Sequence, residues 1–186
     1  ICSYQVEGKL KVKSQMVGPF RNEIIPLSEV PYQIYYKTYR AGIWKEASME
    51  VGHTDEDGFF SMQFNREGGN ACEGQYIKVE VSFADGEDIS ITKGNDDLWG
   101  RWHRIGYRNN GQCSPGTCDF GSLVYKESAS DSNGIKRNDR YNRRHADIWW
   151  VSRFMIDELE SLGHSMGGML SIAHPHNEFG WSPINI

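Results

Sequence analysis

The sequence lacks two features that would place it at once in a large protein class: a long apolar segment and an excess of basic residues. No apolar run approaches the ~18 residues that a membrane-spanning helix needs. The chain has 20 Lys and Arg residues against 25 Asp and Glu residues, whereas nucleic-acid binders usually concentrate a basic excess on one face. We therefore expect no membrane span and no nucleic-acid partner, and we interpret the basic cluster at residues 136–144 as a solvated loop leading into a helix.

Glycosylation sites and paired cysteine knuckles are also missing. The sequence contains no Asn-x-Ser/Thr acceptor and no paired CxxC, so zinc binding by its four cysteines is disfavoured. Cys113 and Cys118 bracket the segment CSPGTC, in which a Pro-Gly turn returns the chain and brings the two sulfur atoms together. Cys2 and Cys72 remain as the second pair. We predict both disulfides, which indicate an oxidising compartment and a secreted, extracellular protein.

The residues that are present suffice for one real core. The chain has nine Tyr, eight Phe and six Trp among its 186 residues, too many for a disordered chain. This length suits one domain with an appendage. Because the chain begins at Ile1, without an initiator Met or a signal segment, we expect either a processed mature protein or a cut fragment.

The first two thirds of the chain show the period-two alternation of half-buried strands. Between residues 4 and 14, Val6, Leu10 and Val12 alternate with charged residues, which predicts an opening strand. The segment IPLSEVPYQIYYKTY predicts the second strand. One of its faces carries Val30, Tyr32, Ile34 and Tyr36, and the other carries Tyr35 and Tyr39.

Further strands are separated by turn signals rich in Asp, Glu, Gly and Asn. Short strands at this spacing favour a mainly β protein, an antiparallel β-sandwich of the immunoglobulin kind. The predicted strands span residues 47–52, 59–64, 76–84, 89–92, 98–104 and 123–126.

Three of these segments together resemble a known module. The run GKLKV, then IPLSEVPYQIYYK, then GHTDEDGFFSMQF is similar to the transthyretin-like and carboxypeptidase-regulatory-like modules. The resemblance covers about residues 4–92 and implies a transthyretin-like sandwich. It implies little about function, since such modules serve as accessory, adhesive and structural parts of many proteins.

The residues of the TDEDG segment explain why it forms a turn. Asp55 or Asp57 can bond to backbone N–H groups, Gly58 can take a positive φ, and Phe59 or Phe60 then enters the core. We interpret the segment as a turn rather than a calcium site, because the further spaced carboxylates of a complete site are missing.

After residue 126 the hydrophobic period changes. Residues 127–142 are polar and predict a linker. Residues 143–162 predict an amphipathic helix that ends at Gly163. Its stripe requires cover from the sandwich or from a neighbouring molecule. The stripe consists of Ile148, Val151, Met155, Leu159 and Leu162, and it is flanked by Trp149, Phe154 and Ile156.

Two short strands are predicted after the helix, at residues 169–173 and 182–186. We therefore expect a β-sandwich domain at residues 1–126, a polar linker at 127–142, and a helix plus short-strand appendage at 143–186. The appendage faintly resembles the segment that precedes the zinc-binding helix of some secreted metallopeptidases. The HExxH helix itself is absent from the sequence.

Gly163–Gly168, GHSMGG, matches the nucleophile elbow of α/β-hydrolases and would make Ser165 a nucleophile. The elbow requires a buried strand before the serine, but the preceding MIDELESL is charged and helical in period. The parallel sheet of a hydrolase is not predicted either. We expect no catalytic residue here and interpret the motif as a glycine-rich helix end.

Histidines offer the next candidate site. The extended segment His174-Pro175-His176 points both imidazoles one way, but spacing fixes no third ligand. We expect no metal site and no cofactor.

Tryptophans offer a candidate glycan platform, because flat rings stack on sugar faces. Since two adjacent tryptophans on a helix cannot both enter a small core, Trp149 or Trp150 is expected to meet a partner. Core or interface packing is the alternative for all of these rings. The other tryptophans considered are Trp99, Trp102 and Trp181.

The leading hypothesis is a non-catalytic extracellular structural or adhesion protein that self-assembles as a surface or filament subunit. The alternatives are an accessory fragment of a secreted metallopeptidase and a carbohydrate-binding module. We predict that residues 177–186 dock on an open sheet edge of a neighbouring subunit to form a homo-oligomer or filament; folding back onto the chain's own helix is the alternative. The predicted assembly or ligand contacts are Trp149, Trp150, Phe179, Trp181, Ile184 and Ile186.

Overall fold

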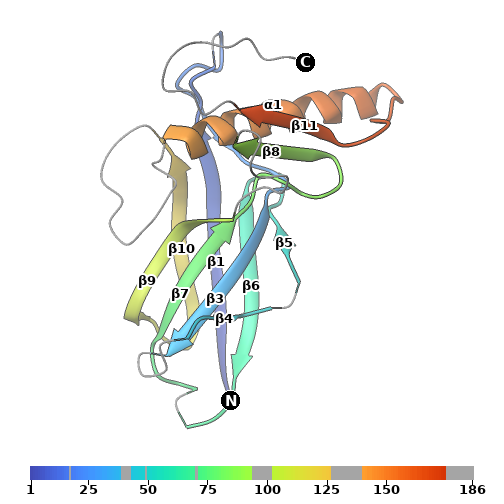
Figure 1. The fold of residues 1–186 in the computed structure, drawn as a ribbon. Coiled ribbons are helices and arrows are strands. Elements are labelled where there is room, and N and C mark those ends of the chain that lie inside the picture. The colour runs from blue at the N-terminus through green and yellow to red at the C-terminus, as the bar shows by residue number, and fades with distance from the viewer. Residues whose placement is uncertain are drawn as a thin grey trace.

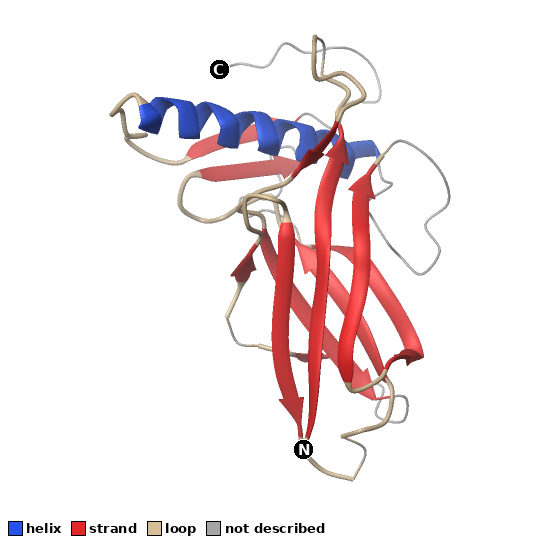
Figure 2. Cartoon of the chain, turned by 180° about the vertical axis from the view of Figure 1, so that it is seen from behind, coloured by secondary structure: helices blue, strands red, loops and turns tan. Residues whose placement is uncertain are grey.

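A β-sandwich with a helix across one end forms the described part of the chain (Figure 1). The computed structural model describes residues 1–16, 18–38, 43–48, 50–69, 71–93, 102–126 and 140–174. The long strands connect the end that holds the N-terminus with the end that α1 (Arg140–Ser161) crosses (Figure 2). The prediction of a mainly β fold with a C-terminal helix is confirmed.

Sheet A, with four strands, is built around the first strand. β1 (Cys2–Lys13) pairs in parallel with β10 (Gly116–Tyr125) along one edge. Its other edge pairs antiparallel with β6 (Phe59–Arg66) and then with β2 (Ile24–Pro26). The period-two pattern predicts the facing of β1 correctly, since the residues buried in it are Tyr4, Val6, Leu10 and Val12.

Sheet B, with five strands, packs against sheet A. β3 (Pro31–Thr38) and β9 (His103–Cys113) flank β7 (Gln75–Val81), and each pair is antiparallel. The other edge of β3 pairs with β4 (Lys45–Glu46) and β5 (Gly52–His53).

The short strands β4 and β5 show that the single strand predicted at residues 47–52 is wrong. The pairing with β3 is interrupted between them, where the Ser48 hydroxyl group accepts a hydrogen bond of 3.1 Å from the Glu50 N–H group. A serine that bonds to the backbone two residues later forms a local turn in place of a strand ladder.

The inner faces of the two sheets share one hydrophobic core. The ring of Phe64 on β6 lies between Tyr4 and Tyr36, with centroid distances of 5.3 and 5.0 Å and near-parallel planes. Sheet B contributes a row of aliphatic side chains, among which Ile34, Ile77, Val79 and Val81 are buried.

The TDEDG turn forms as its residues predict. Asp55 Oδ1 accepts hydrogen bonds from the N–H groups of Asp57 and Phe59, at 3.0 and 2.8 Å. Gly58 has a φ of 71°, and Phe60 is buried. A Cβ atom at Gly58 would collide with the carbonyl oxygen of Leu10, so the position also needs glycine for space.

β9 and β10 are longer than the strands predicted there, and the turn between them passes from sheet B to sheet A. The strand predicted at residues 98–104 lies partly outside the described residues, and the one at residues 123–126 covers only the end of β10. Most of β9 has the sequence RIGYRNNGQC, whose Asn and Gly residues are typical of turns. Shifts in the β7–β9 register accommodate the irregular strand.

A helix and a two-stranded parallel sheet close the end of the sandwich opposite the N-terminus (Figure 1). β8 (Ile89–Lys93) pairs with β11 (Leu170–His174), which confirms the short strand predicted at residues 169–173. Gly163, with a φ of 82°, follows α1 as predicted. The strand predicted at residues 182–186 and residues 127–139 of the predicted linker lie outside the described residues.

The buried face of α1 is not the predicted apolar stripe, and this prediction is corrected. The indole of Trp149 lies 5.8 Å from the Phe83 ring, and its Nε1–H group donates to the Ser28 carbonyl at 2.9 Å. With Trp149 buried, Ile148 at the start of the predicted stripe only partly packs against the core, and the end of the stripe faces outward, so that Met155 and Leu162 are 58% and 71% exposed. The residues of α1 that are buried instead include Ala146, Trp149, Ser152 and Ile156.

Candidate functional site

The outward face of sheet B carries a cluster of aromatic and cationic side chains. Strand alternation explains it, because inward Ile34, Ile77 and Val79 leave the residues between them facing away from the core. All of these outward side chains are half-buried. We call the cluster the aromatic–cationic face, and it consists of Tyr35, Lys37, Trp44, Tyr76, Lys78, Arg104 and Tyr107.

Aromatic and cationic residues alternate across the strands of this face. Tyr35 on β3 lies directly opposite Lys78 on β7, which lies directly opposite Tyr107 on β9. One step along the strands, Lys37 lies opposite Tyr76. Because directly opposed side chains are ~5 Å apart, Lys37 and Lys78 each have a ring as a nearest cross-strand neighbour, whereas Arg104 lies opposite Glu80.

The cations lie over the rings at cation–π distances. The Lys78 ammonium group is 4.2 Å from the Tyr35 centroid and 5.0 Å from that of Trp44. The Lys37 ammonium group is 4.8 Å from the Trp44 centroid and 5.0 Å from that of Tyr76. Each such contact contributes about 0.5–1 kcal/mol at an exposed site, so these lysines are held in defined positions.

Arg104 and Tyr107 complete the face along β9. The Arg104 guanidinium group lies 5.3 Å from the Tyr107 centroid and 6.0 Å from that of Trp44. The rings also touch one another, since Tyr107 is 6.1 Å from Trp44 and 6.3 Å from Tyr76. Trp44 is therefore the centre of the face, surrounded by all three cations.

Two carboxylates border the face. Glu80 Oε1 accepts a hydrogen bond of 2.7 Å from the Lys78 ammonium group, and Glu46 lies opposite Tyr35. Three cations against two carboxylates leave the face with net positive charge in a chain whose formal net charge is −5. The net charge of the face is therefore opposite in sign to that of the whole chain.

Two tyrosines of the face have perturbed acidity. Burial raises the pKa of Tyr35 above its ordinary value of 10.0, and the charges of Glu80 and Glu46 raise it further. Burial and Tyr76 raise the pKa of Tyr107, while Arg104 partly opposes this rise. Both phenols therefore stay neutral at physiological pH and act as hydrogen-bonding and stacking groups.

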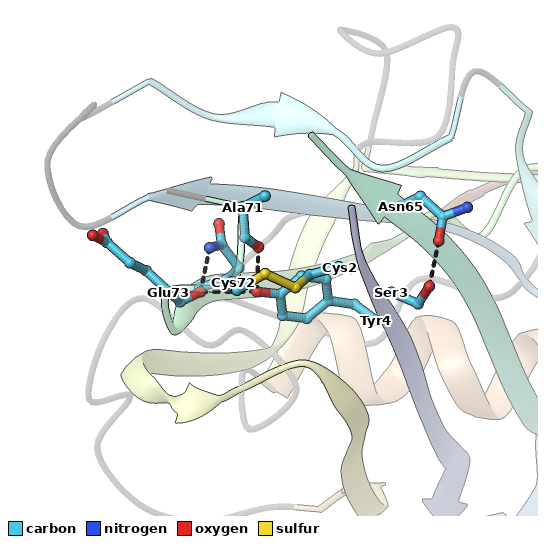
Figure 3. The surroundings of a disulfide bond; sticks show 8 residues. Cys2, Ser3, Tyr4, Asn65, Ala71, Cys72 and Glu73 are labelled. Atoms are coloured by element: carbon cyan, nitrogen blue, oxygen red, sulfur yellow. Dashed lines mark hydrogen bonds between the residues drawn. A yellow bond between two sulfur atoms is a disulfide. The ribbon is translucent and has the colours of Figure 1, made fainter. Parts of the chain in front are cut away.

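The predicted Cys2–Cys72 disulfide is confirmed, and it ties the start of β1 to the connection between the two sheets (Figure 3). The Tyr4 hydroxyl group lies 2.8 Å from the carbonyl oxygens of both Ala71 and Glu73, which flank Cys72. The side chain of Tyr4 thus supports the same turn that the disulfide holds.

The predicted Cys113–Cys118 disulfide is also confirmed. It joins the end of β9 in sheet B to β10 in sheet A across the turn that contains Gly116, which has a φ of 109°. Both sulfur atoms are buried with their residues. Each disulfide therefore connects sheet A with the sheet B side of the sandwich, at the end away from the helix.

Of the predicted contact residues, only the two helix tryptophans lie within the described part of the chain. Trp149 is fully buried, so its assignment to an assembly or ligand surface is corrected to a core residue. Trp150 is half-buried, and its ring packs edge-on against Phe20 at 5.4 Å. The remaining predicted contacts, Phe179, Trp181, Ile184 and Ile186, lie outside the described residues.

The other sequence candidates do not come together as a site in the part of the chain that the structure describes. Ser165 is exposed and follows the helix α1. The hydrolase motif requires a strand before the serine, so Ser165 does not fit it. His174 ends β11, while Pro175, His176 and Trp99 lie outside the described residues. Within the described ranges no cluster of His, Cys, Asp and Glu side chains has metal-binding geometry.

Sequence reasoning missed the aromatic–cationic face. The predicted contacts included tryptophans of the helix and of the C-terminal segment, whereas Trp44 is the tryptophan at the centre of the face. A signal was present in β3 and β7, where Tyr35 and Lys37 alternate with core residues, as do Tyr76 and Lys78. The irregular strand β9, which supplies Arg104 and Tyr107, carries no such alternation.

Comparisons with known proteins place the chain in no family. No protein-family model matches it, and no curated protein matches its sequence. Among solved structures, a 9R-lipoxygenase from Cyanothece matches 68% of this chain over 17% of its own length, with 12% identity and a TM-score of 0.36. The major plantain pollen allergen Pla l 1 matches 70% of this chain over 98% of its own, with the same identity and TM-score. At such TM-scores neither likeness supports a statement about function.

Proposed function

We propose that this chain is a non-catalytic extracellular adhesion protein that attaches to its target through the aromatic–cationic face. The observation that carries this proposal is the alternation of rings and cations centred on Trp44. A sheet face that meets only water needs no tryptophan, and aromatic and Arg side chains are enriched where proteins bind partners. The contacts between rings and cations also order these side chains before a partner arrives, which reduces the entropy lost on binding.

An extracellular location is supported by the cysteines. Both disulfides are of the kind that persists in oxidising compartments, and the described residues include no free cysteine. No helix among the described residues is long and apolar enough to cross a membrane. We further propose that the sandwich is a transthyretin-like module, on the strength of the TDEDG turn and its Asp55 and Gly58 geometry.

Self-assembly as a surface or filament subunit is the second candidate function. It is favoured by the apolar residues that α1 and the following segment expose. Phe154 is 53% exposed, Met155 58%, Leu162 71% and Met169 45%. Exposed patches of apolar side chains commonly mark a protein interface. This candidate uses a different surface from the aromatic–cationic face, so the two can be tested separately.

The adhesion proposal is tested by binding to immobilised extracellular polymers, including neutral polysaccharides, acidic polysaccharides and fibrous matrix protein. The variant Trp44→Ala/Tyr107→Ala removes the centre of the face, and we expect it to lose at least about tenfold in affinity, since a hot-spot residue contributes about 2 kcal/mol or more. Its matched control is Gln5→Ala/Gln63→Ala, two exposed residues paired on the outer side of sheet A.

Either of two results contradicts the proposal. The wild-type protein binds no polymer of the panel, or the face variant binds as tightly as the wild type and the control. Circular dichroism of each variant, with its thermal midpoint, establishes that the sandwich is folded in every measurement.

A further inference from the structure

We infer that the ligand of the aromatic–cationic face is an acidic polysaccharide, one that carries carboxylate or sulfate groups at regular intervals. This inference rests on the proposed function, since it names the partner class of the same face. Two observations support it: lysine ammonium groups lie over the rings of the face, and the net charge of the face is positive.

The positions of the cations argue against a neutral sugar. A neutral sugar binds by stacking its flat side on an open ring face. On this protein Lys37 and Lys78 both lie over Trp44, within 5.0 Å of its centroid, and Lys78 also lies over Tyr35. A neutral sugar must displace these ammonium groups, whereas an anionic polymer meets them where they are.

The arrangement of the cations suits a polymer with repeated charges. Lys37 and Lys78 stand diagonally on adjacent strands, a geometry that places such positions ~7–8 Å apart. Arg104 lies opposite Glu80, one step further along β7 from Lys78. The three cations therefore form a row that crosses β3, β7 and β9, and a linear chain laid along this row meets one cation after another.

The rings give each cation a role that an ordinary surface lysine lacks. A lysine on a solvated surface loses conformational freedom when it binds an anion. Lys37 and Lys78 are already half-buried and held against rings, and the Glu80 carboxylate takes only one of the three donors of the Lys78 ammonium group. The remaining donors can therefore bind a ligand anion with little further ordering.

The distribution of charge over the molecule favours an anionic partner for the face. The chain has a net charge of −5, which repels polyanions in general, but the face is positive. A polyanion is therefore attracted to this surface even though the chain as a whole is negatively charged. The disulfides favour a polysaccharide outside the cell over a nucleic acid as this polyanion.

The test measures binding of the intact chain to heparin, polygalacturonate and neutral dextran as a function of salt. We expect binding to an acidic polymer and none to dextran. Counterion release by about three cations predicts that log K falls with log[salt] with a slope of about −2 to −3. The heparin and polygalacturonate arms distinguish sulfate from carboxylate as the preferred anion.

Charge variants complete the test. Lys37→Gln/Lys78→Gln should weaken binding at least about tenfold and reduce the salt slope to about −1. Lys9→Gln/Lys13→Gln is the matched control, because it removes the same charge from exposed positions on β1 of sheet A and should leave the affinity within about twofold.

The outcomes separate this inference from the proposed function. Dextran binding as tight as heparin binding, or a slope near zero, overturns the acidic ligand but leaves an adhesive face. Tighter binding of single-stranded DNA than of either acidic polysaccharide also overturns the inference, in favour of a nucleic acid. Binding to none of these polysaccharides overturns the inference, and it contradicts the proposed function as well if fibrous matrix protein is not bound either.

Discussion

The ammonium group of Lys78 on β7 lies 4.2 Å from the centre of the Tyr35 ring on β3. Tyr107 lies directly opposite Lys78 on its other side. A lysine so placed between two rings is neither a solvated surface charge nor a core residue. This relationship repeats with Lys37 beside Tyr76, and it makes the outer side of sheet B the surface that the adhesion proposal depends on.

The two disulfides are predicted to stabilise the fold to different extents. Cys2 and Cys72 are separated by 70 residues, and Cys113 and Cys118 by 5. In the loop-entropy model the longer loop contributes about 4 kcal/mol and the shorter about 2 kcal/mol. Urea unfolding of Cys2→Ser/Cys72→Ser and Cys113→Ser/Cys118→Ser measures both. Equal losses, or a larger loss for the second variant, would contradict the model.

Trp149 is predicted to be a stability residue and Trp150 a minor one. Trp149→Ala opens a cavity and removes the hydrogen bond to Ser28, for an expected loss of about 3–5 kcal/mol. Trp150→Ala should cost about 1–2 kcal/mol, because this side chain is only half-buried. Chemical denaturation followed by far-ultraviolet circular dichroism compares the two. A larger loss in the free energy of unfolding for Trp150→Ala than for Trp149→Ala would contradict the assignment of Trp149 as the core residue.

The helix shows what the sequence can and cannot determine. Its existence, its end at Gly163 and the strand after it follow from period and turn chemistry. The face that it buries does not, because that face is set by a long-range fit. Trp149 reaches Ser28 and Phe83, and Arg153 meets Asp88 at 3.2 Å, and no local pattern encodes these partners.

The candidate site illustrates the same limit. Alternation in β3 and β7 predicts that Tyr35 and Lys78 point outward, but not that these strands are neighbours in this register. Trp44 precedes the two-residue strand β4, and Tyr107 follows a register irregularity in β9. The disulfides, by contrast, could be predicted, since a five-residue loop with a Pro-Gly turn leaves few alternatives.

Alkaline pH is predicted to destabilise the fold through buried tyrosines. Burial raises the pKa of Tyr4, Tyr32, Tyr35 and Tyr107 above the ordinary value of 10.0. The unfolded chain therefore loses these protons first, so stability is fully present below about pH 10 and falls as pH rises through the raised values. Urea midpoints measured across this range should decrease.

The matched variant for this pH effect is Tyr32→Phe, whose ring stays buried beside Phe60. It removes one tyrosine with a raised pKa, so stability should decline less steeply above about pH 10. The variant also loses the hydrogen bond from the Tyr32 hydroxyl group to Ser61. Tyrosinate absorbance should show part of the tyrosines titrating late in the folded protein. Titration of all tyrosines at the unfolded value would contradict the burial of these rings.

Self-assembly through the exposed helix face is predicted to be sensitive to charge. Met155→Glu/Leu162→Glu places two carboxylates on the exposed apolar residues and should shift oligomers to monomer, because burying an unpaired charge in an interface is unfavourable. Light scattering over a concentration series measures this shift. Deletion of residues 177–186 tests the predicted tail docking in the same assay. Assembly unchanged in both variants would reject these surfaces, and a wild type that is monomeric throughout would reject self-assembly.

The most direct test of the aromatic–cationic face as a binding site for acidic polysaccharide is a nuclear magnetic resonance titration of the intact chain with heparin-derived oligosaccharides, read from backbone amide shifts. The aromatic–cationic face predicts that the largest shifts fall on β3, β7 and β9 around Tyr35, Lys78 and Tyr107, and that they diminish as salt is added. Shifts concentrated on α1, on the outer side of sheet A, or nowhere in the protein would contradict it.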